Sequence, residues 1–96
     1  MALVAIVDDR VTNRNIFSKL AASIAPDISV RAFADPRDAL AWLGDNTADL
    51  IITDYKMPEM DGAEFVRALR AQPRNVDVPV VVLTVYEERS YRLRAL

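Results

Sequence analysis

The chain has 96 residues and a formal net charge of −2, and 52% of its residues are hydrophobic. This length suits one domain, and this hydrophobic content is enough to build a core and argues against disorder. So small a charge imbalance gives no reason to expect direct binding to nucleic acid. The absence of cysteine and histidine excludes disulfides, thiolate metal sites and a histidine general base.

The N-terminal apolar run "ALVAIV" meets "DD" without a basic lead or a cleavage site, so it does not have the form of a signal peptide. No apolar stretch is long enough to cross a bilayer. We therefore expect a cytoplasmic protein with no membrane partner.

Apolar runs and helical periodicity alternate along the chain. Strands are predicted over 3–7, 28–33, 49–53 and 79–84, and helices over 12–24, 35–44, 62–72 and, as the start of a fourth, 87–96. The first, third and fourth strands are continuous apolar runs, which is typical of strands buried on both faces. Alternation of this kind predicts an α/β fold with a parallel sheet, right-handed crossovers and helices on both faces.

Capping and helix-terminating residues mark the expected ends of the helices. Thr12 is the better-placed cap for the first helix. Asp35 is expected to cap the second, with Pro36 in its first turn and Gly44 at its exit.

Polar side chains stand where three of the expected strands end. Asp8 and Asp9 follow the first strand, Asp54 follows the third, and Thr84 closes the fourth. Ligand sites in open parallel sheets form beyond the carboxyl ends of the strands. If the first and third strands are neighbours, their ends lie about 5 Å apart. Three carboxylates that close repel one another unless a cation compensates, and Mg²⁺ prefers such oxygen ligands.

Each of these residues also has a simpler interpretation. Asp8 and Asp9 are possible helix caps, Asp54 is a possible turn residue, and Thr84 suits a strand by its β propensity alone. A capping role does not explain why acids from two strands point at one edge. The metal site is therefore the favoured interpretation.

The motifs "VDD", "TDYKMPEMDG" and "VVVLT", taken in order, resemble the receiver domain of two-component response regulators. The resemblance covers the whole chain as one domain, 1–96. It implies a flavodoxin-like, doubly wound parallel sheet of strand order 2-1-3-4, with the family's fifth strand and fifth helix missing from this chain, so that the domain is incomplete at its C-terminus.

The resemblance also implies roles for individual residues. Asp54 becomes the phosphoacceptor, and the Thr84 hydroxyl contacts the phosphoryl group. Asp9 becomes a direct Mg²⁺ ligand, Asp8 a metal partner through water, and Asp54 and the Lys56 backbone carbonyl become further ligands. The implied partners are a histidine kinase or phosphotransfer protein and a C-terminal output domain, and the implied role is regulatory rather than enzymatic, beyond self-phosphorylation and self-dephosphorylation.

The loop that follows Asp54 is expected to line the site. Pro58 stiffens the loop, and Gly62 relieves backbone strain before the next helix. Met57 and Met60 are expected to pack beneath the loop rather than to contact a ligand.

The chain also departs from the family pattern. Its only lysines are Lys19 and Lys56, and neither is placed to act as the phosphoryl-pairing lysine that ends the family's fifth strand. The fourth strand would become a bare apolar edge, so association of two copies through that edge is expected. The segment "LTVYEERSYRLRAL" resembles receivers placed ahead of cyclic-di-GMP phosphodiesterase (HD-GYP) domains.

Two other functions stay open. One is a receiver-like interaction or dimerisation module that is not phosphorylated, which the missing lysine favours and the retained acids disfavour. A phosphatase of the haloacid dehalogenase type needs a second aspartate two residues after the first, and Lys56 occupies that position.

Overall fold

A computed structural model of the chain describes residues 2–86 and 90–95, with side chains as far as Leu83. The strands are β1 (Ala2–Val7), β2 (Ile28–Phe33), β3 (Leu50–Asp54), β4 (Val80–Tyr86) and β5 (Ser90–Ala95). The helices are α1 (Val11–Ile24), α2 (Pro36–Asp45), α3 (Gly62–Arg70) and the short 3-10 helix η1 (Pro73–Asn75).

The strands form one sheet of order β2-β1-β3-β4-β5. The first four strands in this order are parallel, which confirms the predicted order 2-1-3-4. In the register of the sheet, Val7 of β1 lies opposite Thr53 of β3, and Asp54 lies opposite Leu83 of β4. This register brings the end of β1 and the end of β3 to the same edge.

The end of the chain differs from the prediction. Ser90–Ala95 form a strand antiparallel to β4, so the expected helix start over 87–96 is wrong for these residues, while 87–89 and 96 lie outside the described part. Tyr91, Leu93 and Ala95 alternate with Arg92 and Arg94, a period of two that suits a strand. Pairing with β5 satisfies the backbone N–H and C=O groups that an unpaired β4 edge would leave without partners. The expected association of two copies through a bare β4 edge therefore loses its basis.

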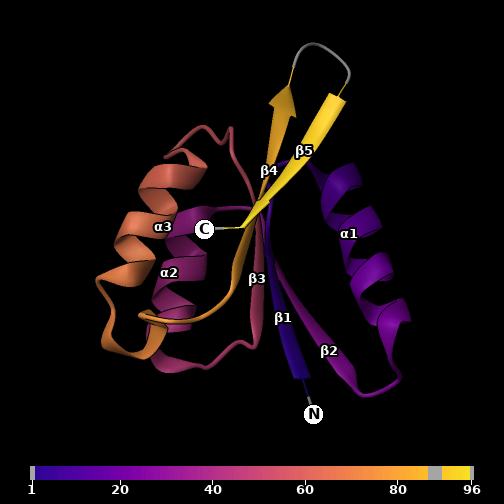
Figure 1. Ribbon diagram of the computed structural model, residues 1–96, viewed down its shortest axis with the longest axis horizontal. Helices are drawn as coiled ribbons and strands as arrows, with labels where there is room; N and C mark the ends of the chain where they lie inside the picture. The colour runs from indigo at the N-terminus through magenta and orange to yellow at the C-terminus, as the bar shows by residue number, and fades with distance from the viewer. Residues whose placement is uncertain (1, 87–89, 96) are drawn as a thin grey trace.

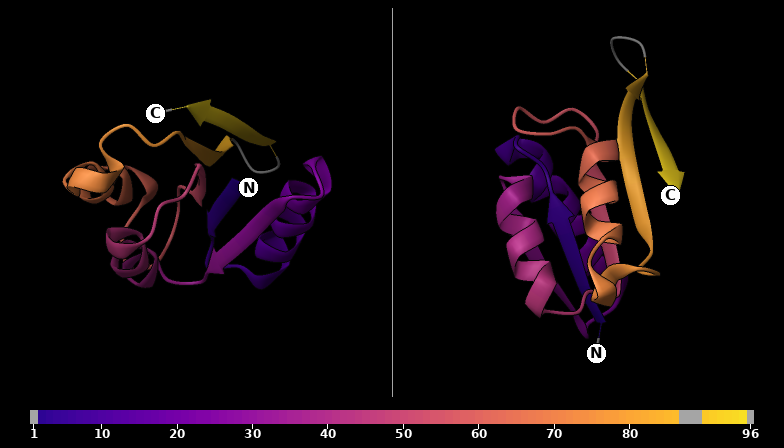
Figure 2. Two further views of the ribbon diagram at one scale, coloured as in Figure 1. Left: turned by 90° about the horizontal axis from the view of Figure 1, so that it is seen from below. Right: turned by 90° about the vertical axis from the view of Figure 1, so that its left-hand side faces the viewer.

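Helices cover the two faces of the sheet unequally. Figure 1 shows α2 and α3 together on one face and α1 alone on the other, and Figure 2 shows the same layers from two further directions. Under α2 and α3 the core includes fully buried Phe65, Leu69, Leu43 and Ile51. Parallel sheets are normally covered on both faces, so the sparser α1 side is the unusual one.

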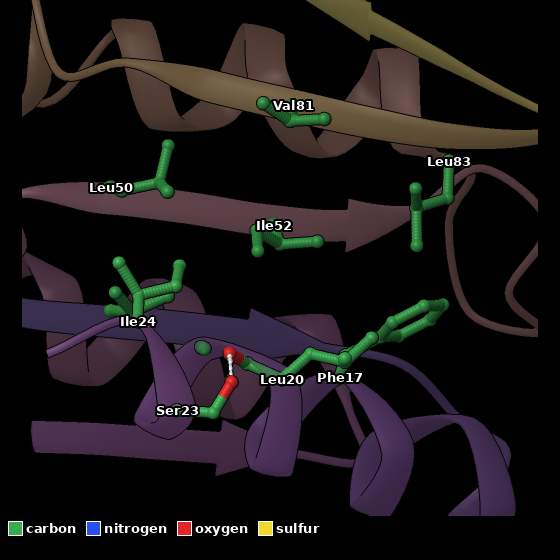
Figure 3. Close-up of a pocket in the computed structure, with 10 residues that line it drawn as sticks. Phe17, Leu20, Ser23, Ile24, Leu50, Ile52, Val81 and Leu83 are labelled. Carbon is green, nitrogen blue, oxygen red and sulfur yellow. Dashed lines mark hydrogen bonds between the residues drawn. The ribbon is translucent and has the colours of Figure 1, made fainter.

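An apolar groove of about 520 Å³ lies between α1 and the sheet (Figure 3). Phe17, Leu20 and Ile24 line it from α1, and side chains of β1, β3 and β4 line it from the sheet. Leu20 is 59% exposed and Ile24 is 73% exposed, so this side of the molecule keeps apolar surface in contact with solvent.

The helix ends confirm one predicted cap and correct another. The Asp35 side chain accepts a hydrogen bond from the Arg37 N–H at 2.8 Å, and Pro36 opens α2 as predicted. α1 begins at Val11 after Arg10 and has no side-chain cap, so the cap predicted at Thr12 is wrong. Gly44 lies inside α2, which runs on to Asp45.

Both methionines of the loop after Asp54 pack as predicted. Met57 is buried in the core, and Met60 packs against the same core. No helix in the described part of the chain is long and apolar enough to cross a membrane.

Candidate functional site

Three carboxylates meet at the carboxyl edge of the sheet. Asp8 and Asp9 follow the last residue of β1, and Asp54 is the last residue of β3. One carboxylate oxygen from each of the three lies within 4.8 Å of the others. The convergence predicted from the strand ends is therefore present.

Asp8 is fixed at three points. Its N–H donates to the Phe33 carbonyl at 3.0 Å, which ties it to β2. Its Oδ1 accepts the Arg10 N–H at 2.9 Å, and its carbonyl oxygen accepts a bond from Arg14 Nη1 at 2.9 Å. The remaining oxygen, Oδ2, is buried and has no hydrogen-bond partner among the described residues.

Asp54 is held by the backbone that follows it. Its Oδ1 accepts the Tyr55 N–H at 2.9 Å, and the same N–H donates to the Leu83 carbonyl at 2.9 Å. The Asp54 carbonyl accepts a bond from the Thr53 hydroxyl at 3.0 Å. The Asp54 side chain, only 5% exposed, is therefore locked to the sheet at its base.

Asp54 and Asp8 hold their protons more tightly than ordinary carboxyl groups, because the pKa of each is raised. Burial and, after it, the charge of Asp8 raise the pKa of Asp54 to about 6, although the hydrogen bond from Tyr55 opposes the rise. The pKa of Asp8 is also raised, first by burial, while the bond from the Arg10 N–H lowers it. The site thus carries an electrostatic cost that a bound cation would remove.

The loop after Asp54 folds back tightly on the end of the strand. The Gly62 N–H donates to the Tyr55 carbonyl at 2.6 Å. A Cβ at position 62 would lie 3.0 Å from Tyr55 Cα and 3.1 Å from the Asp54 carbonyl oxygen. Glycine is therefore required by close approach of two backbones, which replaces the backbone strain expected from the sequence.

The donor set fits a hard divalent cation. The ligand atoms on offer are carboxylate oxygens, which Mg²⁺ prefers. Two of the buried atoms, Asp8 Oδ2 and Asp9 Oδ1, have no hydrogen-bond partner within the described ranges 2–86 and 90–95. Buried polar atoms without partners are rare in folded proteins, and a metal or ordered water would satisfy both.

For two of the expected site residues, the structure gives a position in the chain but not the expected contact. Thr84 lies in β4 directly after Leu83, the residue opposite Asp54, and its side chain lies outside the described part. Lys56 lies in the loop two residues after Asp54 with an exposed side chain. Its carbonyl group as a metal ligand stays a prediction.

The sequence analysis missed Arg14, whose guanidinium reaches back from the second turn of α1 to the Asp8 carbonyl. The available signal was the helical spacing that puts residue 14 one turn beyond Arg10, on the side that returns to the strand end. Arg10 was also missed, although its charge lowers the pKa of both Asp8 and Asp54.

Comparison with known proteins gives a consistent family assignment. The family model described as "Response regulator receiver domain" matches residues 4–96. The chemotaxis response regulator CheY4 of Vibrio cholerae has a solved structure that is similar with a TM-score of 0.82 and 36% identity, covering 92% of this chain and 72% of that one.

Two curated relatives extend the comparison. The cyclic di-GMP phosphodiesterase response regulator RpfG of Xanthomonas campestris is 40% identical over 97% of this chain and 25% of its own length. The chemotaxis protein CheY of Pseudomonas aeruginosa is 33% identical over 96% of this chain and 73% of its own length. The chain thus spans a quarter of the first relative and most of the second.

Proposed function

Because the chain belongs to the response regulator receiver family, we propose that it is a phosphoacceptor domain in which Asp54 takes a phosphoryl group from a histidine kinase or phosphotransfer protein. The observation that carries this proposal is the meeting of Asp54 with Asp8 and Asp9 at one edge of the sheet. A relic kept only for packing has no use for three acids that repel one another.

The reaction is a nucleophilic substitution at phosphorus. A carboxylate oxygen of Asp54 attacks the phosphorus of a phosphohistidine, the P–O bond forms, the P–N bond breaks, and the departing imidazole nitrogen takes a proton from solvent. The product is an acyl phosphate on Asp54. The chain acts as a regulatory domain rather than as an enzyme with an outside substrate.

The described residues contribute position and charge. The bond from the Tyr55 N–H to Asp54 Oδ1 restricts rotation of the carboxylate, and the bond from the Thr53 hydroxyl to the Asp54 carbonyl fixes the backbone beside it. Asp8 and Asp9, with the carbonyl of Lys56, would hold Mg²⁺ beside it. Mg²⁺, when bound, supplies positive charge that offsets the negative charge of the phosphoryl oxygens. The hydroxyl of Thr84 is assigned to one of those oxygens.

Signalling then requires a partner domain that recognises the phosphorylated edge of the sheet. RpfG is named as both a response regulator and a cyclic di-GMP phosphodiesterase, and this chain matches a quarter of it. We assign the chain to a longer regulator with a C-terminal output domain, with a cyclic-di-GMP phosphodiesterase as the specific expectation. The assigned compartment is the cytoplasm.

Intact-mass measurement tests the proposal. Incubation with acetyl phosphate and Mg²⁺ is expected to add one phosphoryl group to the wild type and none to Asp54→Asn. Asp38→Asn, an exposed acid on α2, is the matched control and is expected to react like the wild type. A wild type that stays unmodified at high donor concentration, or an Asp54→Asn variant that still reacts, would refute the assignment.

A second candidate is a module that works by association without phosphorylation. The exposed apolar side chains of α1, including Leu20 and Ile24, favour it. Sedimentation of the wild type over a wide concentration range separates the two functions. Self-association that is unchanged in Asp54→Asn, together with no phosphoryl uptake, would select this second function.

A further inference from the structure

Among the residues that the structure describes, Arg14 is the one whose side chain bonds to Asp8. The other two bonds to Asp8 involve backbone groups of Phe33 and Arg10. The Nη1 of Arg14 donates to the Asp8 carbonyl at 2.9 Å. That carbonyl and the Asp9 N–H belong to the same planar peptide unit. An anchor on the carbonyl therefore fixes the plane from which the Asp9 side chain departs.

The bonds around Arg14 form a closed circuit. The Arg14 N–H donates to the Arg10 carbonyl at 3.0 Å, which is the first helical bond of α1. The Arg10 N–H donates to Asp8 Oδ1, and the Arg14 side chain returns to the Asp8 carbonyl. The turn from β1 into α1 is thereby held at its β1 end through Asp8 and at its α1 end through Arg10 and Arg14.

This circuit matters because little else holds α1 in place. The helix has no side-chain cap, and Ala21 is its only buried residue. Packing alone therefore fixes the start of α1 weakly, and the orientation of the acids depends on polar bonds. A guanidinium suits this task because its planar fork offers several donors while its charge is kept at any physiological pH.

We propose that Arg14 is a positioning residue that sets the direction of the Asp8 and Asp9 carboxylates and thereby sets the affinity of the acidic edge for Mg²⁺. This proposal rests on the function proposed above, because that function requires Mg²⁺ at the acidic edge. It adds that cation affinity is controlled by a residue that touches neither the metal nor the phosphoryl group.

Arg14→Met removes both the donor and the charge at similar length. Calorimetric titration with Mg²⁺ is expected to show about a tenfold loss of affinity, the usual effect of removing a group that orients a metal ligand. Arg14→Lys keeps the charge and one donor, so it is expected to recover part of the loss. Arg74→Met is the matched control, because Arg74 bonds to Thr47 Oγ1 at 2.8 Å and packs near Gly44, between the ends of α2 and η1.

A second readout needs no metal. In the ¹H–¹⁵N spectrum of the metal-free protein, Arg14→Met is expected to move the Asp9 amide resonance while that of core residue Leu69 stays in place. Arg74→Met is expected to move neither. The dispersed Leu69 resonance also establishes that each variant is folded.

The outcomes are distinguishable. A wild type that binds no Mg²⁺ refutes the proposed function, and the Asp9 resonance alone then decides whether Arg14 positions the turn. An Asp9 resonance that Arg14→Met leaves unmoved overturns the positioning role. If Arg14→Met binds Mg²⁺ within twofold of the wild type while losing as much stability as Arg74→Met, Arg14 is only a stabilising residue and the inference is overturned.

Discussion

The two helices that lead away from the acidic edge are held in different ways. α3, which follows the Asp54 loop, begins with a reciprocal capping box between Asp61 and Glu64 and buries Gly62, Phe65 and Leu69. α1, which follows Asp8 and Asp9, has no side-chain cap and buries Ala21 alone. The helix that follows Asp54 is thus fixed by a cap and by packing, whereas the helix that follows Asp8 and Asp9 is fixed mainly by a few hydrogen bonds.

Because of this difference, we expect substitutions near α3 to change mainly the stability of the fold and substitutions near the start of α1 to change mainly the geometry of the site. Changes on the α3 side should lower the free energy of unfolding, because they remove buried contacts or disturb close packing. Changes on the α1 side should cost less stability, because much of that helix is already exposed to solvent. The following substitutions test the contrast in order of decreasing effect.

The largest effect is expected from Phe65→Ala. Phe65 is fully buried between α3 and the sheet, so its truncation should lower the free energy of unfolding by about 3–5 kcal/mol. Phe17→Ala on α1 is the matched comparison and should cost clearly less, because Phe17 lines the open groove. Urea unfolding followed by tryptophan fluorescence measures both, with Phe65→Leu as a milder variant if Phe65→Ala does not fold. Equal losses at the two positions would contradict the contrast.

Gly62→Ala should lower the free energy of unfolding by about 1–3 kcal/mol, because the new methyl group would press on the backbone at Tyr55 and Asp54. Gly44→Ala is the control. Its Cβ would meet nothing closer than Gln72 Nε2 at 3.6 Å, and replacing this glycine in the last turn of α2 should stabilise the helix by up to about 0.5–1 kcal/mol. Thermal unfolding of the pair should therefore shift in opposite directions. A stabilised Gly62→Ala would show that the loop can move away from the strand end.

Removing the Asp54 charge should stabilise the metal-free protein. Burial and the neighbouring acids raise the pKa of Asp54 to about 6 in the folded state, against 3.8 for the ordinary group. The folded state therefore binds the proton more tightly, and stability falls as the pH rises from about 4 through about 6. At pH 7.5 without metal, Asp54→Asn should be more stable than the wild type by about 1–2 kcal/mol.

Added Mg²⁺ should reduce this advantage, because it stabilises the folded wild type by binding. Unfolding measured at pH 4.5 and pH 7.5, with Mg²⁺ or with a chelator, checks both statements. Asp38→Asn should show no such pattern. A wild type whose stability rises between these pH values in chelator would refute the electrostatic cost assigned to the edge.

The smallest effect is expected at the helix starts. Asp61→Ala breaks the capping box of α3 and should lower the free energy of unfolding by about 1 kcal/mol. Thr12→Ala should change it by less than about 0.5 kcal/mol, because Thr12 is an exposed residue inside α1 and caps nothing. Equal losses in chemical denaturation would mean that Thr12 caps α1 in solution.

Local patterns in the sequence were enough to predict a parallel sheet with acids at its strand ends, and the resemblance to receiver domains supplied the order 2-1-3-4. Continuous apolar runs identify buried parallel strands, and such strands direct their carboxyl ends to one edge. Asp8, Asp9 and Asp54 therefore converge whatever the details of the loops. The Asp35 cap and the burial of Met57 were equally local consequences of neighbouring residues.

Other features depend on distant partners and were decided by the tertiary structure. The pairing of β5 with β4 depends on an open strand edge, which helical spacing within 87–96 does not reveal. The need for glycine at position 62 comes from the approach of the Tyr55 backbone, and the bond from Arg14 to Asp8 comes from the angle at which α1 leaves the sheet. The sequence by itself determined which charges meet at the edge. How firmly each carboxylate is held in position depended on burial and on hydrogen bonds that exist only after the chain has folded.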